Sequence, residues 1–434
     1  MFIPLLLIVL AALSAGVVAY GTHPGWGQFE NGLQFIVWSR RLQWPLVTLS
    51  LALCLLLIAL VILGKRRAWW LIGLGPILAL FIHHFASFAP DRAGALAVIE
   101  DPPLVDAAEA HGLSDDDWVV GVNFAGGEYA YPYSCLFQSP VIVQTDRESR
   151  MVILWSAYAN RVLAFRATDA VKARNFEVVS TPANAPLIYD CRHGQFINGL
   201  KGLTLDGKAP SGFGLPLRTT KTTWKQWHNS NPDGKVMTCS GASGRAGPTR
   251  PILPAWRMPG SRVGLPEADV ARHVTVVGTY KPAVLETSDV TAAPINLIAD
   301  GRQVLLFRPA PDAAPRAFDA ALPGDPHAAN AGNDPAHSSP AGQAHSAGSG
   351  PIPDTASSWF VRPGRDTRRL LAAHPQAAFV EINSNTVWTT DGLGVARTKS
   401  AGKHLQPYPV DDDVAWDVIK YWYPDLKVTS QPGP

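Results

Sequence analysis

The 434-residue sequence predicts three N-terminal transmembrane α-helices followed by a mainly β (β-rich α+β) soluble domain built from two similar units. Three observations lead to this prediction. Apolar runs of membrane-spanning length fill the first 88 residues, short runs rich in Val, Ile, Tyr and Phe follow, and several short motifs recur in order. Hydrophobic residues are 47% of the chain and charged ones 17%, which favours membrane segments, while a net charge of +2 offers no basic field for nucleic acid.

The membrane region is expected at residues 1–88, with apolar runs at Phe2–Tyr20, Trp44–Gly64 and Ala68–Phe88. Each run is about 20 residues long, enough to cross roughly 30 Å of hydrocarbon as a helix. The first run lacks the basic start of a signal peptide, so we interpret it as a retained span.

The orientation follows from the basic triplet at 65–67, because short basic loops stay in the cytoplasm. The N-terminus is therefore expected inside and the soluble domain outside. Arg40 and Arg41 oppose this orientation, since they would then face the outside. A location of residues 31–43 along the membrane interface would soften the conflict.

Two adjacent histidines, His83 and His84, lie in the third apolar run. Ionisable residues inside a membrane are functional candidates, and these two could ligate haem or bind a quinone. The simpler interpretation is a neutral pair near the outer interface, because no other apolar run holds a histidine.

The soluble part is expected to comprise a linker at 89–116, a first unit at 117–240, a connector at 241–270 and a second unit at 271–430. Val-Val-Gly at 119–121 returns at 276–278. A pattern of Trp, seven residues, Pro-Asp, one residue and Lys-Val begins at Trp224 and again at Trp416. Motifs repeated in order indicate a duplication, and the junction of two such units would be the default cleft.

Residues 309–357 differ from the rest of the second unit. Ala, Pro, Gly, His, Ser and Asp dominate there, and large apolar residues are almost absent. Such a segment buries too little apolar surface to offset its ordering entropy, so we expect a disordered insertion.

Each unit is expected to hold one short helix. Trp224 and Trp416 open these helices at equivalent positions, which favours a shared role in the core. Trp227 and His228 differ from their counterparts, Ile419 and Lys420, so they are candidates for a function specific to the first unit. The acidic run at 411–413 is interpreted as the N-terminus of the second helix, where carboxylates offset the helix dipole.

Cys135, Cys191 and Cys239 lie in the soluble part, and no Cys-x-x-Cys motif occurs. In an oxidising compartment two of them would pair; we favour Cys191 with Cys239, because both fall in expected strands of one unit. Free thiols and a metal site are the alternatives. Cys191 and His193 are two apart, so on a strand they share a face, and with Cys239 they could bind copper.

The segment Gly202–Lys208 nearly matches a phosphate-binding loop. It lacks the Ser or Thr that should follow the lysine, and Pro210 prevents a helix from starting there. We therefore do not interpret it as a nucleotide site.

Five short motifs occur in the order of a known family: 119–122 (Val-Val-Gly-Val), 128–132 (Glu-Tyr-Ala-Tyr-Pro), 187–190 (Leu-Ile-Tyr-Asp), Gly199-x-x-Gly202-x-x-Leu205, and Thr222-Thr223-Trp224-x-x-Trp227 with Pro232. The chain thus resembles the bacterial family catalogued as domain of unknown function 3179, over about 117–430. The resemblance implies kinship of fold and a location in the bacterial cytoplasmic membrane; it implies no reaction.

Members of that family typically carry Cys-Pro-Leu-Cys after the third strand, where this chain reads Trp155-Ser156-Ala157-Tyr158. A family Tyr-Asp-Arg-x-Thr pattern is likewise altered around Asp190. The chain therefore looks like a divergent member, to which no role of the cysteine pair can be transferred. The candidate ligand-binding residues are Trp155, Tyr158, Asp190, His193, Trp227 and His228.

The sequence contains no Gly-x-Ser-x-Gly and no His-Glu-x-x-His motif. We therefore expect a non-enzymatic, membrane-integral envelope protein, with no cofactor, that binds a protein partner or a small ligand outside the cytoplasm. The alternative is a metal-dependent or redox protein using Cys191, His193, His228 and Cys239, with copper or haem as its cofactor.

Overall fold

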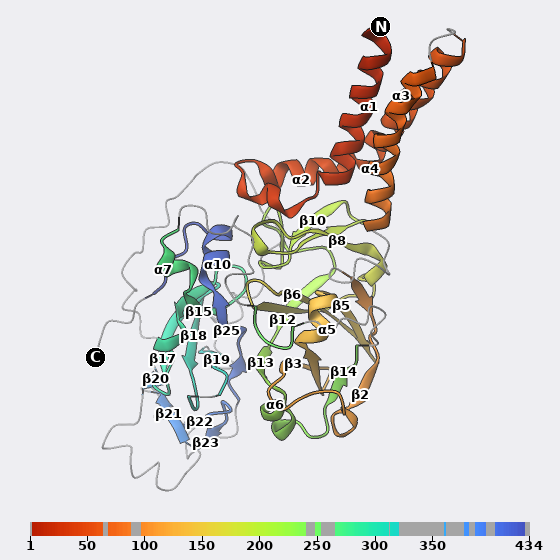
Figure 1. The fold of residues 1–434 in the computed structure, drawn as a ribbon. Coiled ribbons are helices and arrows are strands. Elements are labelled where there is room, and N and C mark those ends of the chain that lie inside the picture. The colour runs from red at the N-terminus through yellow and green to blue at the C-terminus, as the bar shows by residue number, and fades with distance from the viewer. Residues whose placement is uncertain are drawn as a thin grey trace. The chain divides into compact units, whose positions relative to one another are not determined.

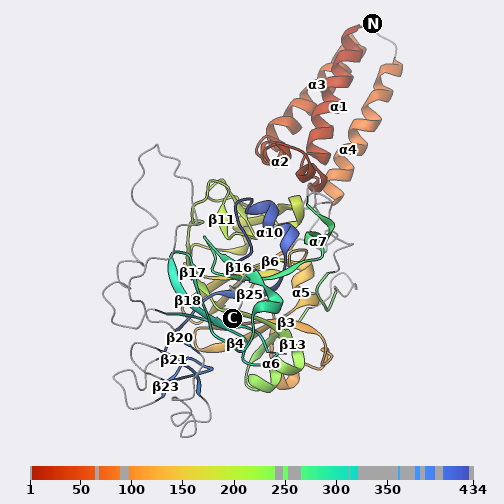
Figure 2. The same cartoon turned by 90° about the vertical axis from the view of Figure 1, so that its left-hand side faces the viewer.

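A computed structural model describes residues 2–63, 68–87, 97–239, 248–252, 265–311, 313–320, 360–361, 377–381, 387–395 and 404–429. The chain divides into two compact units (Figures 1 and 2). The first unit comprises residues 1–217, 223–272 and 415–425, and the second comprises 218–222, 273–414 and 426–434. The soluble domain is mainly β and begins near residue 97, as the sequence predicts in its coarse outline.

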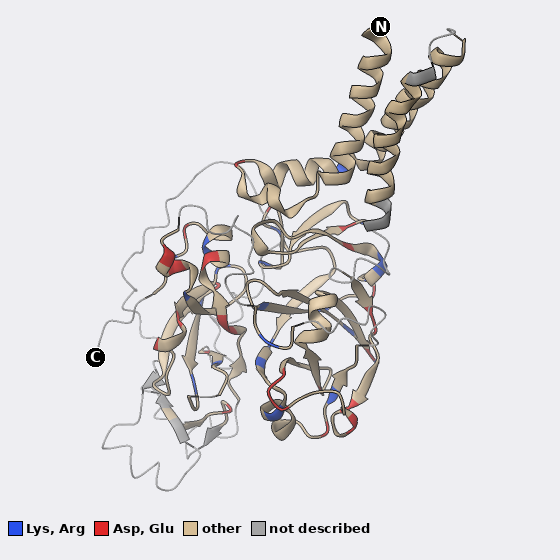
Figure 3. Ribbon diagram, in the orientation of Figure 1, with Lys and Arg blue, Asp and Glu red and all other residues tan. Residues whose placement is uncertain are grey.

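Among its described residues, the N-terminal region contains two helices long and apolar enough to cross a membrane, α1 (Phe2–Tyr20) and α3 (Gln43–Leu63). Figure 3 shows no acidic or basic residue along either ribbon. The prediction of three spans is wrong by this criterion. The third run forms a 3₁₀ helix, η2 (Ala68–Gly73), and then α4 (Leu74–Ser87), whose 14 residues extend only about 21 Å.

The interruption of the third run has a local cause, since Gly73, Gly75 and Pro76 cluster at the junction of η2 and α4. Helix α4 nevertheless packs along α1, where Ile77 and Phe81 join a buried cluster with Ala11. In Figures 1 and 2, α1, α3 and α4 lie side by side.

Helix α2 (Gly32–Arg41) links α1 to α3, after the 3₁₀ turn η1 (Pro24–Gln28). It packs on the β-rich part of the first unit through Ile36, which is fully buried against Val179 and Phe196. Arg40 pairs with Glu177 through two nitrogens, so this arginine serves to fix α2 on the sheet.

The β-rich part of the first unit has three sheets. One has the order β1-β5-β6-β7-β12, a second is the meander β8-β9-β10-β11, and a third contains β3, β4, β14 and β2 as neighbours. The strands are β1 (Val98–Glu100), β2 (Leu104–Asp106), β3 (Trp118–Phe124), β4 (Gly127–Pro132), β5 (Val141–Asp146), β6 (Ser149–Ser156), β7 (Arg161–Ala167), β8 (Phe176–Ser180), β9 (Leu187–Asp190), β10 (Gln195–Asn198), β11 (Leu203–Thr204), β12 (Phe213–Leu217) and β14 (Lys235–Met237).

Short helices join these strands: η3 (Ala107–Glu109), α5 (Tyr133–Gln138), η4 (Ala173–Asn175), η5 (Pro182–Asn184), α6 (Trp224–Ser230) and α7 (Glu267–Val270). Residues 98–106, predicted to belong to a linker, instead form β1 and β2. β1 pairs in parallel with β5, and β2 pairs with β14, so the β-rich part begins before residue 117.

A disulfide joins Cys135 to Cys239, and the predicted Cys191–Cys239 pair is wrong. The reason is the parallel pairing of β14 with β4. Cys239 follows β14 and Cys135 lies in α5, which follows β4, so parallel strands carry the two sulfurs to the same end. Cys191 is a free, exposed thiol in the turn between β9 and β10.

The described residues of the second unit also form three sheets, with orders β16-β15-β25, β17-β18-β19-β24 and β20-β21-β22-β23. The strands are β15 (His273–Val277), β16 (Ala283–Glu286), β17 (Ile295–Ala299), β18 (Arg302–Phe307), β19 (Arg316–Asp319), β20 (Phe360–Val361), β21 (Ala377–Glu381), β22 (Val387–Thr389), β23 (Gly394–Val395), β24 (Gln406–Pro407) and β25 (Val410–Ala415). β13 (Thr219–Thr223) belongs mostly to this unit, as does η8 (Thr287–Asp289), whereas the final helix α10 (Trp416–Trp422) belongs to the first.

Two sequence expectations change in the second half. The predicted disordered insertion at 309–357 lies largely outside the described residues, but its beginning contains β19. The acidic run at 411–413 does not start a helix; it lies in β25, and α10 begins at Trp416 with Ala415 as its cap.

Candidate functional site

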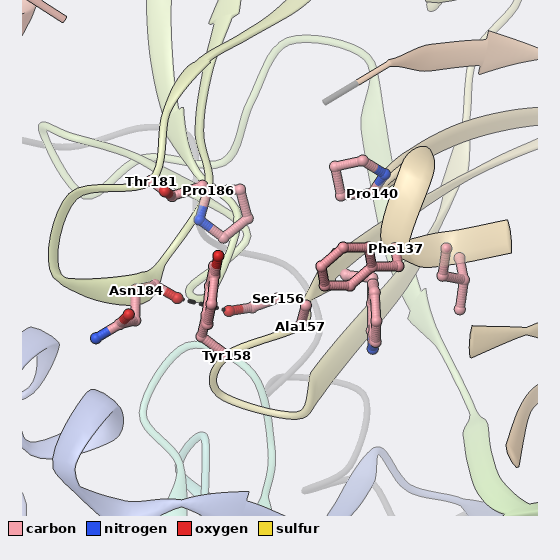
Figure 4. Close-up of a pocket in the computed structure, with 10 residues that line it drawn as sticks. Phe137, Pro140, Ser156, Ala157, Tyr158, Thr181, Asn184 and Pro186 are labelled. Atoms are coloured by element: carbon pink, nitrogen blue, oxygen red, sulfur yellow. Dashed lines mark hydrogen bonds between the residues drawn. The ribbon is translucent and has the colours of Figure 1, made fainter. Parts of the chain in front are cut away.

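A small cavity of about 150 Å³ lies where the turn between β6 and β7 meets α5 and η5 (Figure 4). Its position matches the stretch that departs from the family's cysteine motif. The lining consists of Leu136, Phe137, Pro140, Trp155, Ser156, Ala157, Tyr158, Thr181, Asn184 and Pro186.

Backbone geometry explains how the chain shapes this cavity. Asn160 closes the β6–β7 turn at φ 52°, a left-handed conformation that asparagine tolerates well. Tyr133 donates a hydrogen bond from its hydroxyl to Asn160 Oδ1 at 2.7 Å, which fixes the turn against α5. On the facing wall, Ala183 and Asn184 are also left-handed, at φ 47° and 66°. The left-handed conformation strains the backbone of Ala183, because the alanine side chain forms no hydrogen bond that would offset the strain.

Trp155 forms the floor of the cavity. It is 2% exposed, and its ring meets that of Tyr133 edge to face at a centroid distance of 5.2 Å. Its indole Nε1 has no hydrogen-bond partner among the described residues. A buried indole N–H usually finds an acceptor, so this donor would gain from a ligand or water that reached it.

The polar groups of the walls are few. Ser156 donates from Oγ to the backbone oxygen of Asn184 at 3.0 Å, which ties the two walls together, as Figure 4 shows. Tyr158 is half-buried, and Thr181 lies beside Pro186. No acidic, basic or thiol side chain is among the lining residues, so the Tyr158 phenol is the ionisable group that they contribute.

Asp190 and His193 form a separate feature in the turn between β9 and β10. His193 Nδ1 lies 2.7 Å from Asp190 Oδ2, and Asp190 Oδ1 accepts the backbone N–H groups of Arg192 and His193. The buried carboxylate therefore holds the turn in shape.

Desolvation and the nearby Glu177 raise the pKa of the Cys191 thiol, which keeps this exposed cysteine protonated and weakly nucleophilic.

Trp227 and His228 lie on α6, in a third place. Trp224 and Trp227 pack with Val119, Ala130 and Val236 in a buried cluster. The His228 ring stacks on the Trp224 ring at 5.0 Å with an interplanar angle of 4°. Of the six predicted ligand-binding residues, the cavity thus contains only Trp155 and Tyr158.

The alternative metal set is not assembled. The Cys239 sulfur is bonded to Cys135, so it is no thiolate ligand for a metal beside Cys191 and His193. Across the described part of the chain, no cluster of three or more His, Cys, Asp or Glu side chains could hold a metal ion. His83 stacks on Tyr20 at 5.5 Å, and His84 Nε2 lies 2.9 Å from Gln43 Nε2.

Several cavity residues escaped the sequence reasoning, namely Ser156, Thr181, Asn184 and Pro186. The run 181–186 (Thr-Pro-Ala-Asn-Ala-Pro) does carry a turn signal. Nothing in it indicates that the turn would face a strand end 28 positions earlier in the chain, because that contact depends on how the sheets pack.

The sequence model of one family, described as a protein of unknown function (DUF3179), matches residues 95–425. The match covers most of the chain, and it includes the cavity, the disulfide and the β-rich parts of both units. No curated protein and no solved structure matches significantly.

Proposed function

The chain belongs to the DUF3179 family, and we propose that it is a membrane-anchored envelope protein that binds a small ligand in the cavity at Trp155 and Tyr158, on the outer side of the cytoplasmic membrane. The observation that carries the proposal is the cavity itself. It combines aromatic walls with a few fixed polar groups, which is the usual chemistry of small-molecule sites.

The size of the cavity limits the ligand. A volume of about 150 Å³ holds one small ring, or one side chain of a partner protein, and nothing larger. The Tyr158 hydroxyl supplies a donor, whereas the Trp155 indole N–H is itself buried. The ligand class that fits is therefore a compact ring with one or two hydrogen-bond acceptors and no requirement for a charged partner.

Binding can be tested on the full chain in detergent, by ligand-observed NMR with a panel of single-ring compounds. Replacing Ala157 with Phe should fill the cavity and abolish binding, whereas Tyr280→Phe, a change outside the cavity, should leave it unchanged. Binding that survives Ala157→Phe, or no binding by any compound that fits, would refute the proposal.

Three features support the proposed location. Helices α1 and α3 have membrane-spanning length. Arg40 on α2 pairs with Glu177 in β8, so α2 and the β-rich part lie on one side of any membrane that α1 crosses. A disulfide in that part is typical of an oxidising compartment, which supports an outer position for this side and an inner one for the N-terminus. In this arrangement η2 and α4, the shorter apolar stretch, return the chain outward after α3.

Cys191 provides the test of location, because it is free and exposed. A membrane-impermeant maleimide applied to intact spheroplasts at pH 8 should label the protein, and Cys191→Ser should remove the label. Labelling that requires lysis would place the domain in the cytoplasm.

We also propose that the soluble part arose by duplication. Its support is the strand order: β5-β6-β7-β12 corresponds to β17-β18-β19-β24, and the meander β8-β9-β10-β11 corresponds to β20-β21-β22-β23. Each copy ends with a short helix whose first residue is tryptophan. This helix is α6 in the first copy and α10 in the second.

A further inference from the structure

A second, larger cavity of about 540 Å³ lies in the first unit, between α2 and the loop that carries β11. Helix α2 contributes one wall and α10 contributes Trp422. The lining consists of Leu33, Gln34, Val37, Trp38, Arg41, Asn198, Lys201, Leu203, Thr204, Leu205, Gly207 and Trp422.

The charges of this cavity are positive. Arg41 and Lys201 are its two charged lining residues, and neither has an acidic partner there. Arg41 instead lies over the Phe196 ring at 5.5 Å, and the Lys201 ammonium lies 4.4 Å from the centre of the Tyr423 ring. Partial burial lowers the pKa of Lys201, so its charge is poorly solvated and would gain from an anion.

Two acids near these cations in the fold, Asp206 and Glu177, are already engaged. Asp206, in the same loop as Lys201, pairs with Lys208 at 3.0 Å, and Glu177 pairs with Arg40. The two lining cations therefore keep their charge available for a bound anion.

The loop itself does not recognise phosphate through its backbone, in spite of its resemblance to a phosphate-binding loop. Thr204 Oγ1 accepts the Lys208 N–H at 3.0 Å, the Gly207 N–H goes to Thr204, and the Leu205 N–H goes to Phe196. Since these amides are used internally, an anion would be held by the side chains of Arg41 and Lys201.

The remaining lining is apolar and reaches the surface. Trp38 is 46% exposed and Leu205 is 38% exposed. Helix α2 lies between α1 and α3 in the sequence. It therefore lies near the C-terminal end of α1 and the N-terminal end of α3. Exposed tryptophans at that level are typical of the membrane–water interface.

We propose that this cavity binds the anionic head group of a membrane phospholipid, with Arg41 and Lys201 facing the phosphate and Trp38 and Leu205 facing the first part of the acyl chains. The proposal rests on the membrane anchoring proposed above and is independent of the small-ligand cavity. It also gives Arg41 a role that explains a basic residue on the outer side.

The test uses the full chain in a neutral detergent and three probes: dihexanoyl phosphatidylglycerol, dihexanoyl phosphatidylcholine and glycerol 3-phosphate. We expect the phosphatidylglycerol to bind at least about tenfold more tightly than either other probe, because only it combines net negative charge with acyl chains. Native mass spectrometry or tryptophan fluorescence reports the affinities.

Arg41→Gln and Lys201→Gln should each weaken that binding about tenfold. Arg41→Lys should retain most of it, and Lys225→Gln, an exposed lysine outside the cavity that pairs with Asp115, should change nothing. Trp38→Ala provides a variant at an exposed site in case Lys201→Gln fails to fold.

Equal binding of the two lipids would overturn the proposal, as would charge variants that bind normally. Glycerol 3-phosphate binding as tightly as the lipid would replace a lipid site with a site for free phosphate esters. Ala157→Phe should leave lipid binding intact, so failure of the small-ligand site and failure of this site are distinguishable.

Discussion

The two halves of the soluble part, residues 118–237 and 273–422, are both built of small sheets but are stabilised by different chemistry. In the first half a disulfide joins α5 to the end of β14, and the adjacent core is aromatic, with Tyr131, Tyr133 and Trp155 all nearly inaccessible. No disulfide occurs among the described residues of the second half. Carboxylates bound to cations and backbone amides take its place.

The strands that precede the two terminal helices show the contrast best. In the first half this strand reads Thr-Thr-Lys-Thr-Thr at 219–223, and in the second it reads Val-Asp-Asp-Asp-Val-Ala at 410–415. Each of the three acids has a partner: Asp411 binds Lys221 at 2.7 Å, Asp412 binds Arg308 at 2.7 Å, and Asp413 binds His273 at 2.9 Å.

The comparison shows that sheets within one chain are held together by different interactions. We therefore expect reduction of the disulfide to destabilise mainly the first half, and loss of charged side chains to destabilise mainly the second. Four predictions test this, from the largest expected effect to the smallest.

Replacing Cys135 and Cys239 by serine should destabilise the first half most. The bond closes a loop with a sequence separation of 104, and releasing such a loop costs about 4 to 5 kcal/mol through the entropy of the unfolded chain. Peptide-resolved hydrogen exchange should show faster exchange in 118–237 and little change in 273–320. Equal loss in both would mean that the halves unfold as one.

Asp412→Ala should lower the free energy of unfolding of the second half by about 3 kcal/mol. It removes the carboxylate that binds Arg308 at 2.7 Å and Thr275 at 2.6 Å, and it leaves a largely buried guanidinium without its counter-charge. Lys281→Ala, at an exposed side chain, is the control and should stay within about 0.5 kcal/mol. If Asp412→Ala lowers the free energy of unfolding no more than the control does, the charge pair contributes nothing to stability.

Alkaline pH should weaken the first half through Tyr129. Burial, a hydrogen bond from its hydroxyl to Asp146 and that carboxylate's charge raise the pKa of Tyr129 to about 12. Because the folded pKa exceeds the unfolded value of about 10, the stabilisation is complete below pH 10 and is lost as pH rises to 12, by about 2 to 3 kcal/mol.

Denaturant melts at pH 9 and pH 11.5 should show this loss, and Tyr129→Phe should reduce it. Burial and Asp300 also raise the pKa of Tyr408 in the second half, so a residual loss should persist in the variant. A loss that Tyr129→Phe leaves unchanged would exclude Tyr129 as its source.

His228→Lys should have the smallest effect, less than about 0.5 kcal/mol. His228 stacks on Trp224, and at the equivalent place in the second half the Lys420 ammonium lies 5.9 Å from the Trp416 ring. Histidine and lysine each cover a tryptophan ring at this position, so lysine should substitute for His228 with little loss of stability. A loss above 1 kcal/mol, measured by thermal unfolding, would show that His228 has a role that lysine cannot fill.

Local patterns in the sequence were sufficient for the mainly β class, the apolar helices α1 and α3, and the paired tryptophan helices. Errors arose wherever a non-local partner decided the outcome. Cys239 bonds Cys135 because β14 runs parallel to β4, a pairing that no spacing reveals. The acids at 411–413 resemble a helix start, but their cationic partners draw them into a strand instead.

The candidate site was partly predictable for the same reason. Trp155 and Tyr158 drew attention because they stand where family members keep cysteines, and both line the cavity. Asn184 could not be identified, since its role depends on the packing of η5 against the end of β6. Asp190 and His193 contact each other, but they shape a turn and contribute nothing to the cavity lining.

Helix α10 has a consequence for the order of folding during synthesis. Residues 415–425 belong to the first unit, where the Trp416 N–H bonds to Arg272 and the Tyr421 hydroxyl donates to the backbone oxygen of Gly27. A ribosome must therefore add about 150 more residues after Arg272 before that unit is complete, which takes roughly 8 to 30 s. Throughout that interval the nascent first unit lacks α10 and exposes the surface that α10 will cover.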